Sequence, residues 1–335
     1  MEPLATTFCP LESTQYTRNK SLNETTEQVV DYSYISIFLV ICILGLVGNG
    51  LLIWFLIFCI KRKPFTIYLL HLAIADFTDL LCASIIQLVK IFHIHDVNLL
   101  SYAIFLMLFG YNTGLHLLTA ISVERCLSVL YPIWYQCRRP KHQSAVACAL
   151  LWALSVLVSG LENFFCILQA MPQFPECRYV YIFSCILTFL VFVPLMVFSN
   201  LILFIQICCN LKPRQPVKLY VIILATVILF LVFAMPMKVL LITGYYFDAT
   251  DKSVWESLPY LNMLSIINCS INPIVYFVVG SLRRKRSRKS LKEALQKIFE
   301  EKPAAVEKER AGLMQAWADM SLPCPCPESM YWDYS

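Results

Sequence analysis

The chain has 335 residues, of which 59% are hydrophobic and 15% are charged, and its mean hydropathy is +0.66. A soluble protein would carry about 25% charged residues, so the composition excludes an ordinary soluble domain and predicts a membrane protein. The net charge of +5 could suggest a nucleic-acid partner, but the position of the basic residues decides what that charge means.

Residues 1–33 are polar and carry two N-glycosylation sequons, at Asn19 and Asn23. Each sequon alone is a weak signal, but two of them before the first apolar stretch favour an extracellular N-terminus. The segment lacks the apolar centre of a cleavable signal peptide. We therefore expect a glycosylated extracellular segment at 1–33, followed by a first span that acts as an uncleaved anchor.

Seven apolar stretches follow, each able to supply the roughly 20 residues that a helix needs to cross the hydrocarbon core. They cover residues 34–60, 66–92, 99–130, 144–165, 179–209, 218–247 and 254–280. The connections between them are too short to hold a separate domain. The sequence therefore predicts an all-α integral membrane protein, with one seven-transmembrane helix bundle at 34–280.

Lys and Arg residues near the span ends gather on one side of the predicted bundle. That side carries Lys61, Arg62, Lys63, Arg138, Arg139, Lys141, Lys212, Arg214, Lys218 and the basic run from Arg283 to Lys297. The other side carries only Arg18, Lys20, Lys90, Arg178 and Lys252. The positive-inside rule then places the N-terminus outside and the C-terminus in the cytoplasm. The basic charge faces the inner leaflet of the lipid membrane and cytosolic partners, so we expect no nucleic-acid partner.

The segment at 281–299 alternates basic residues with apolar ones, mostly at helical spacing. We interpret it as an amphipathic juxtamembrane eighth helix on the inner membrane face; the alternative is a disordered basic tail. Residues 300–335 are of mixed composition and Pro-rich near the end, so we expect a disordered cytoplasmic tail. The chain shows no internal repeat, which counts against the secondary transporters that are built from repeats.

Most of the fifteen cysteines lie inside the apolar stretches, where they act as small apolar side chains. No spacing is typical of a zinc site, and Cys324-Pro325-Cys326 is too tight for one. We expect neither a metal nor a cofactor.

Short polar or proline-containing motifs recur once in each apolar stretch. They are Gly48-Asn49, the run from Leu72 to Asp76, the triplet from Glu124 to Cys126, Trp152, Pro194, the run from Phe233 to Pro236, and the run from Asn272 to Tyr276. This set, in this order, resembles the rhodopsin-like G-protein-coupled receptors over roughly residues 34–300. The run from Glu124 to Tyr135 is similar to the Mas-related receptors. The resemblance implies a plasma-membrane receptor, not an enzyme, that couples an extracellular small peptide, amine or zwitterion to a heterotrimeric G protein.

Asn49, Asp76, Asn268 and Asn272 are polar groups at membrane depth, which must face one another or ordered water. They could form a static polar knot that holds the bundle together. The resemblance implies instead a hydrated, sometimes sodium-binding switch. Gly114 stands where relatives offer a Ser hydroxyl, which puts sodium binding in doubt.

The resemblance assigns the G-protein switch to Glu124, Arg125, Asn272 and Tyr276. Glu124 would restrain Arg125 at rest and release it to meet the G protein. A second acidic restraint from the sixth span is absent, because no acid occurs between residues 210 and 220. We therefore expect a weak resting lock.

The resemblance also implies a disulfide between Cys166 and Cys177 in the outer loop between the fourth and fifth spans. The usual alternative cannot form, because Leu100 occupies the expected position of its third-span cysteine. An extracellular loop is oxidising enough to keep such a bridge. With this loop tied down, we expect an open, shallow ligand mouth.

The expected ligand pocket consists of Glu162, Lys238, Tyr111 and Arg178. Related receptors use an acid at the position of Glu162 for cationic ligands, and a lysine as deep as Lys238 is rarely unpaired. Three alternatives stay open: the two charges neutralise each other, they flank an opening and bind a zwitterion or a peptide end, or Lys238 reaches backbone or water.

Two other function classes have some support from intramembrane residues. A hydrolase would need His71 or His116, but the sequence has neither a Gly-x-Ser-x-Gly nor a His-Glu-x-x-His motif. An ion or solute transporter or channel could use the intramembrane charges as a path, and these are Asp76, Asp79, Glu124 and Lys238. The seven-span motif set has no transport interpretation.

Overall fold

The structure, a computed structural model, describes the backbone of residues 10–60, 64–94, 96–140, 142–168, 175–209, 217–246 and 257–281. Side chains are described for most positions between 32 and 276, except 61–63, 95, 136, 141, 166–178, 207–220 and 241–256. The predicted eighth helix at 281–299 lies, beyond residue 281, outside the described residues, as does the tail at 300–335. The side chains of Asn19 and Asn23 are outside them too.

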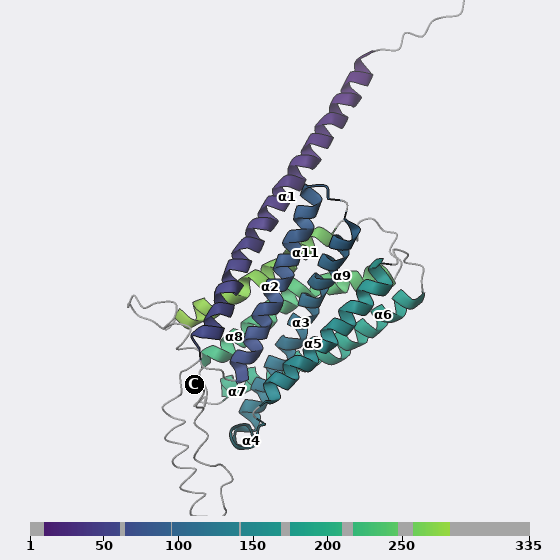
Figure 1. The fold of residues 1–335 in the computed structure, drawn as a ribbon. Coiled ribbons are helices and arrows are strands. Elements are labelled where there is room, and N and C mark those ends of the chain that lie inside the picture. The colour runs from purple at the N-terminus through teal and green to yellow at the C-terminus, as the bar shows by residue number, and fades with distance from the viewer. Residues whose placement is uncertain are drawn as a thin grey trace, which may run out of the picture.

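Every regular element in the described residues is a helix, and together they form an elongated bundle from which the start of α1 projects (Figure 1). The α-helices are α1 (Pro10–Phe58), α2 (Pro64–Ile91), α3 (Val97–Leu130), α4 (Pro132–Cys137), α5 (Gln143–Glu162), α6 (Pro175–Cys185), α7 (Val193–Cys209), α8 (Val217–Leu229), α9 (Met235–Tyr246) and α11 (Leu258–Ser281). Three π-helical segments are η1 (Asn163–Leu168), η2 (Ile186–Phe192) and η3 (Phe230–Ala234). The predicted all-α fold is confirmed.

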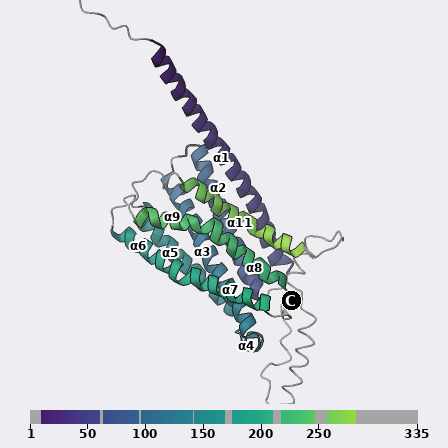
Figure 2. The same ribbon diagram turned by 180° about the vertical axis from the view of Figure 1, so that it is seen from behind.

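Six helical stretches of the described residues are long and apolar enough to cross a membrane. They are Tyr32–Phe58, Pro64–Ile91, Val97–Leu130, Gln143–Phe165, Tyr179–Gln206 and Val221–Leu240. They correspond to the first six apolar stretches of the sequence. The seventh stretch corresponds to α11, whose side chains are described only as far as Tyr276, and it packs along α1 and α2 as part of the bundle (Figure 2).

The element boundaries differ from the sequence prediction at two places. Helix α1 begins at Pro10, whereas the first span was expected from residue 34. The short helix α4 interrupts a segment that the sequence predicted only as a connection. Its first residue is Pro132, which suits the first helical position because its fixed φ matches a helix and its missing N–H would have no partner there.

Two of the π-helical segments come directly before a proline. Pro194 follows η2 and Pro236 follows η3, each within two residues. A proline ring clashes with the carbonyl of the residue four positions earlier and donates no hydrogen bond; these residues, Leu190 and Val232, lie inside η2 and η3. Widening the turn accommodates the ring while keeping the backbone hydrogen-bonded, which a membrane core demands. The widened turn also sets which way the following helix presents its side chains.

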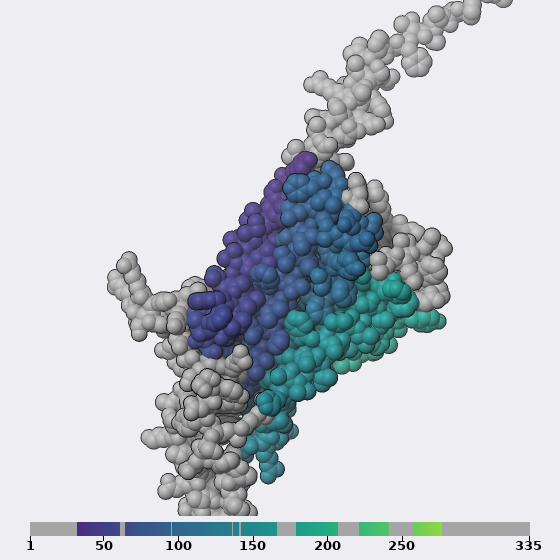
Figure 3. Space-filling model, viewed as in Figure 1, coloured from purple at the N-terminus to yellow at the C-terminus, as the bar shows by residue number. Residues whose placement is uncertain are grey.

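The distribution of polarity is the reverse of that in a soluble protein. Large apolar side chains are exposed on the outside of the bundle, for example Phe58 and Leu190, each 72% exposed. Charged side chains are inside it, for example Asp76 and Lys238. Figure 3 shows one outer face of the bundle, formed mainly by the N-terminal half and the middle of the chain. A continuous apolar exterior of this size needs lipid around it, so the chain is a multi-pass membrane protein.

Helix α3 is the central element, packed against α2, α5 and α7. Buried polar side chains link it to its neighbours: the His116 ring nitrogen lies 2.8 Å from Ser155 Oγ on α5, and Asn200 on α7 donates to Ser122 Oγ at 2.8 Å. Inside a membrane no water competes for these groups, so such bonds fix how the helices are rotated about their axes.

Glycines allow the closest helix contacts. A Cβ placed on Gly45 of α1 would lie 2.3 Å from Ser270 Oγ of α11, and one on Gly110 of α3 would lie 3.0 Å from the carbonyl oxygen of Ala75 on α2. A larger residue at Gly45 would force the side chains of Ser270 and Leu80, or the helices that carry them, to shift. These contacts bring the polar faces of α2, α3 and α11 together.

Candidate functional site

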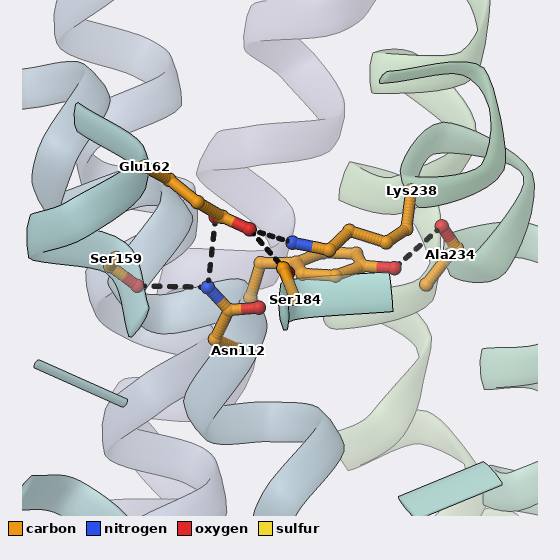
Figure 4. A network of polar contacts seen from close by, with 7 residues as sticks. Asn112, Ser159, Glu162, Ser184, Ala234 and Lys238 are labelled. Carbon is orange, nitrogen blue, oxygen red and sulfur yellow. Dashed lines mark hydrogen bonds and ion pairs between the residues drawn. The ribbon is translucent and has the colours of Figure 1, made fainter. Parts of the chain in front are cut away.

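An ion pair between Glu162 and Lys238 lies inside the bundle (Figure 4). Glu162 is the last residue of α5, and Lys238 lies on α9 just after Pro236. Glu162 Oε1 also accepts a hydrogen bond from Ser184 Oγ at 2.6 Å. Both charged side chains are only 2% exposed, so each charge is compensated by the other and not by solvent.

The other carboxylate oxygen of Glu162 is bound from α3. Asn112 Nδ2 lies 3.4 Å from Glu162 Oε2 and donates a shorter bond, 2.9 Å, to Ser159 Oγ. The neighbouring Tyr111 hydroxyl donates to the backbone oxygen of Ala234 at 3.1 Å. The polar network in Figure 4 therefore joins α3, α5, α6, η3 and α9.

This geometry favours the first of the three alternatives for Lys238, direct neutralisation by Glu162. The depth of the ion pair can be judged from Asn112, which contacts Glu162. Asn112 lies about 22 Å from the start of α3 at 1.5 Å per residue. The pair is thus near the middle of the helix and not at its end. The side chains of Cys166, Cys177 and Arg178 lie outside the described residues, so their parts in the expected disulfide and pocket stay predictions.

A cavity lies beside the ion pair, between α2, α3, α9 and α11. Its lining residues are Asp79, Met107, Leu108, Tyr111, Met237, Lys238, Asn262 and Ser265. Two members of the expected ligand pocket, Tyr111 and Lys238, line it, whereas Glu162 does not. The contribution of α11 to this cavity could not be predicted from the sequence.

A second polar cluster occupies the centre of the bundle. Asn272 Nδ2 donates to Asp76 Oδ2 at 2.7 Å, and Asn49 Nδ2 donates to the backbone oxygens of Gly45 and Cys269, both at 3.0 Å. Four predicted polar-core residues are therefore close together, since Asn268 lines the same small cavity as Asp76 and Asn272.

The central cluster has unsatisfied acceptors around its cavity. The side-chain oxygens of Asn49, Asn268 and Asn272 are buried without a protein donor. Ordered water is the usual partner of such groups, so a hydrated cluster fits better than a dry knot. Gly114 leaves space here, because no atom lies within 4 Å of an added Cβ. Among the described residues no group of three or more His, Cys, Asp or Glu side chains could hold a metal ion.

The third cluster surrounds the end of α3 that leads into α4. Glu124 Oε1 lies 2.6 Å from Nη2 of Arg139, and the same Nη2 donates to Ser144 Oγ at 2.5 Å. The Arg125 guanidinium lies 4.5 Å from the centre of the Phe65 ring, a cation–π distance. Glu124 is thus paired with Arg139. In the sequence analysis, Arg139 was considered only as one of the basic residues on the cytoplasmic side.

Tyr135 of α4 closes the same cluster. The Arg139 guanidinium lies 5.2 Å from its ring centre. Burial, with the nearby Glu124 charge, raises the pKa of Tyr135 to about 12, so the hydroxyl keeps its proton and can donate to the carboxylate. Tyr276, the remaining predicted switch residue, is buried in the main apolar cluster, which contains side chains of α2, α3 and α8.

Sequence reasoning missed several residues of these clusters. Arg139 and Asn112 hold the two predicted acids, and Ser184 completes the shell of Glu162. The sequence could indicate only that each buried acid needs hydrogen-bond donors or a cation beside it. It could not say which of many polar residues would supply them.

Comparison with known proteins agrees with this architecture. Residues 48–276 match the family described as 7 transmembrane receptor (rhodopsin family). The chain is 83% identical over 312 residues to Mas-related G-protein coupled receptor member H of Rattus norvegicus, covering 92% of this chain and 97% of that protein. The corresponding protein of Mus musculus is 81% identical over 312 residues, with the same coverage.

A more distant relative is the Proto-oncogene Mas of Rattus norvegicus, which is 49% identical over 268 residues, or 77% of this chain and 81% of that protein. The matched residues include the three polar clusters at Glu162, Asp76 and Glu124. The chain therefore belongs to the rhodopsin family of seven-transmembrane receptors and, within it, to the Mas-related G-protein coupled receptors.

Proposed function

We propose that this receptor lies in the plasma membrane with its N-terminus outside, and that a small peptide, amine or zwitterion bound from outside activates a heterotrimeric G protein. Residues 1–33 form the glycosylated outer segment, 34–280 the seven-helix domain, 281–299 the helix on the inner membrane face, and 300–335 the cytoplasmic tail. The protein does no chemistry itself and needs no cofactor.

The observation that carries this proposal is that one helix bears residues of two charged clusters. Asn112 of α3 bonds to Glu162, and Arg125 lies about 20 Å further along the same helix. A ligand that alters the cluster around Glu162 can therefore shift or rotate α3 and so move Arg125. The ligand must bind the active arrangement more tightly than the resting one, since only a difference in affinity shifts the population.

The central cluster around Asp76 and Asn272 lies between the Glu162 cluster and Arg125. Asn272 bonds to Asp76, and Tyr276 lies one turn further along α11, toward the cytoplasmic side. A change in the hydration of the cluster or in the Asp76–Asn272 bond would reposition Tyr276 relative to Arg125. We assign this cluster, with Asn49 and Asn268, the role of the switch that separates resting and active packings.

At the G-protein face, Arg139 competes with Arg125 for the Glu124 carboxylate. Glu124 would restrain Arg125 at rest, but the carboxylate is already paired with Arg139. An acid that serves two cations holds each one less firmly, which supports a weak resting lock and appreciable basal signalling.

The test is nucleotide exchange on a G protein by the purified receptor, without and with Arg125→Ala. Exchange should occur with the unmodified receptor and be abolished in the variant, while surface expression in cells is unchanged. Arg138→Ala is the matched control, because Arg138 is an exposed arginine close to the same cluster. Full exchange by the Arg125 variant at equal receptor density would contradict the assigned role.

The ligand end comprises Glu162, Lys238, Tyr111 and Arg178. Because the two opposite charges are paired, we expect a purely polycationic ligand to bind this receptor less tightly than relatives that carry two acids. With an agonist available, Glu162→Gln and Lys238→Met should each lower its potency at least ten-fold, about 1.4 kcal/mol. Unchanged potency for both, at matched surface density, would leave the pair with a structural role only.

A further inference from the structure

Asp79 is a buried carboxylate for which the described residues supply no cation. We propose that Asp79 binds the positively charged nitrogen of a slender primary or secondary amine, at the floor of the cavity between α2, α3, α9 and α11. This names the ligand chemistry for the receptor function proposed above, and it rests on that function in taking the cavity as the ligand's entry site.

The first argument is the pairing of the acids inside the bundle. Glu162 is paired with Lys238, and Glu124 with Arg139. Asp76 accepts a 2.7 Å bond from the amide of Asn272. Asp79, in contrast, accepts a hydrogen bond from the Cys269 thiol, with 3.4 Å between Sγ and Oδ2.

That contact compensates little of the charge, because a thiol is a weak donor. The Asp79 residue is 3% exposed, so bulk water does not solvate it. A carboxylate in such a place is costly unless a positive charge or a proton accompanies it. Among the described residues no cation pairs with Asp79, so a bound cation would supply the compensation that the carboxylate needs.

The second argument is the cavity that Asp79 lines. Its apolar wall consists of Met107, Leu108 and Met237, and its polar groups include Asn262 and Ser265 of α11. Apolar walls with a few convergent polar groups are the composition of small-molecule sites, and a slender ligand would enter here by displacing the flexible methionine side chains. The apolar wall suits a hydrocarbon stem, and flexible methionines adapt to its shape.

The third argument is the sign of the field in the cavity. Lys238 also lines it, but its charge is matched by Glu162. The uncompensated charge that faces the cavity is therefore that of Asp79, and it favours a cation. A charge-assisted hydrogen bond to the carboxylate is about twice as strong as a neutral one, and the oxygens of Asn262 and Ser265 can accept the remaining N–H groups of an ammonium.

The position of Asp79 also links such a ligand to the switch. Asp79 lines both this cavity and the neighbouring one that contains Asp76 and Asn272. A cation at Asp79 would change the electrostatic field at Asp76, one turn along α2. Binding of the amine is thereby coupled to the Asp76–Asn272 bond.

The experiment measures binding to the purified full-length receptor in lipid nanodiscs, with no G protein present. The probes are 3-phenylpropylamine, a cation at neutral pH, and 3-phenylpropanol, its uncharged counterpart. The amine should bind the unmodified receptor at least ten-fold more tightly than the alcohol. Asp79→Asn should remove this preference and leave the affinity for the alcohol unchanged, while Asp79→Glu should keep part of it.

Asp96→Asn is the matched control, because Asp96 is an exposed acid at the start of α3. This variant should keep the full preference for the amine. Failure of the amine to bind the unmodified receptor, equal affinity for the two probes, or a preference that survives Asp79→Asn would overturn the proposal.

A second variant covers the case in which Asp79→Asn does not fold. Met107→Trp would fill the cavity without changing its charge, and it should abolish binding of the amine to the folded receptor; unchanged binding would overturn the proposal. The two proposals fail separately. Binding that depends on Asp79 in a receptor that drives no nucleotide exchange would contradict only the proposed function, whereas exchange without Asp79-dependent binding would contradict only this inference.

Discussion

Replacing Lys238 by Met should destabilise the receptor strongly. Among the described residues, the change leaves the buried Glu162 carboxylate with the Ser184 hydroxyl and the Asn112 amide as its partners. These neutral donors cannot balance a full charge in a side chain that is 2% exposed. Removing one partner of a buried ion pair typically costs about 3–5 kcal/mol, and we expect a loss of that size in the free energy of unfolding.

The double variant Glu162→Gln/Lys238→Met should recover most of this loss. It removes both charges, and the Gln side chain can still accept the bond from Ser184. Because replacing a whole buried pair is often nearly neutral, the double variant should lie within about 1 kcal/mol of the unmodified receptor. The two single changes would then be non-additive by several kcal/mol, the signature of directly interacting residues.

The assay is chemical denaturation of the purified receptor in detergent, with surface density in cells as a second readout. Lys90→Met is the matched control, because Lys90 is an exposed lysine in the last turn of α2. If Lys238→Met costs no more than the control, or if the single effects simply add in the double variant, the ion pair is not what stabilises this part of the bundle.

We expect three further outcomes. Arg139→Gln should lower basal signalling about five-fold, equivalent to about 1 kcal/mol, because Glu124 is then free to hold its neighbouring arginine; Arg138→Gln should leave it unchanged, and a rise with the first variant would refute the assigned competition. Peptide mapping without reduction should recover Cys166 joined to Cys177, and alkylatable thiols at both positions in surface-expressed receptor would refute the bridge. Gly45→Ala should destabilise by about 1–3 kcal/mol, because the new methyl group overlaps a hydroxyl of α11; unfolding that is unchanged would show that the helices separate there at no cost.

The positions of the membrane helices could largely be predicted from the sequence. The bilayer imposes a local requirement, about 20 apolar residues in a row, and this leaves its mark on each stretch independently of the others. Helix α11 carries Asn262, Asn268 and Asn272, and its place in the bundle depends on neighbours that shelter those amides.

Backbone irregularities were only partly predictable. The prolines at 194 and 236 were recognised as features of membrane helices, but not the widened turns that precede them. A proline can kink a helix, widen a turn or end it, and the choice depends on what packs around the freed carbonyl groups. The surroundings come from other helices, which the local sequence does not contain.

The partners of the buried charges were decided by the tertiary structure. Glu124 has Arg125 beside it in the chain, but the ion pair found among the described residues is with Arg139, which lies beyond α4. The sequence determined that Asp79 would be inside the membrane, because it lies in an apolar stretch. That it lines two cavities, and that no cation of the described residues pairs with it, follows from the rotation and depth of α2, α3 and α11, which are set by helix packing across long stretches of chain.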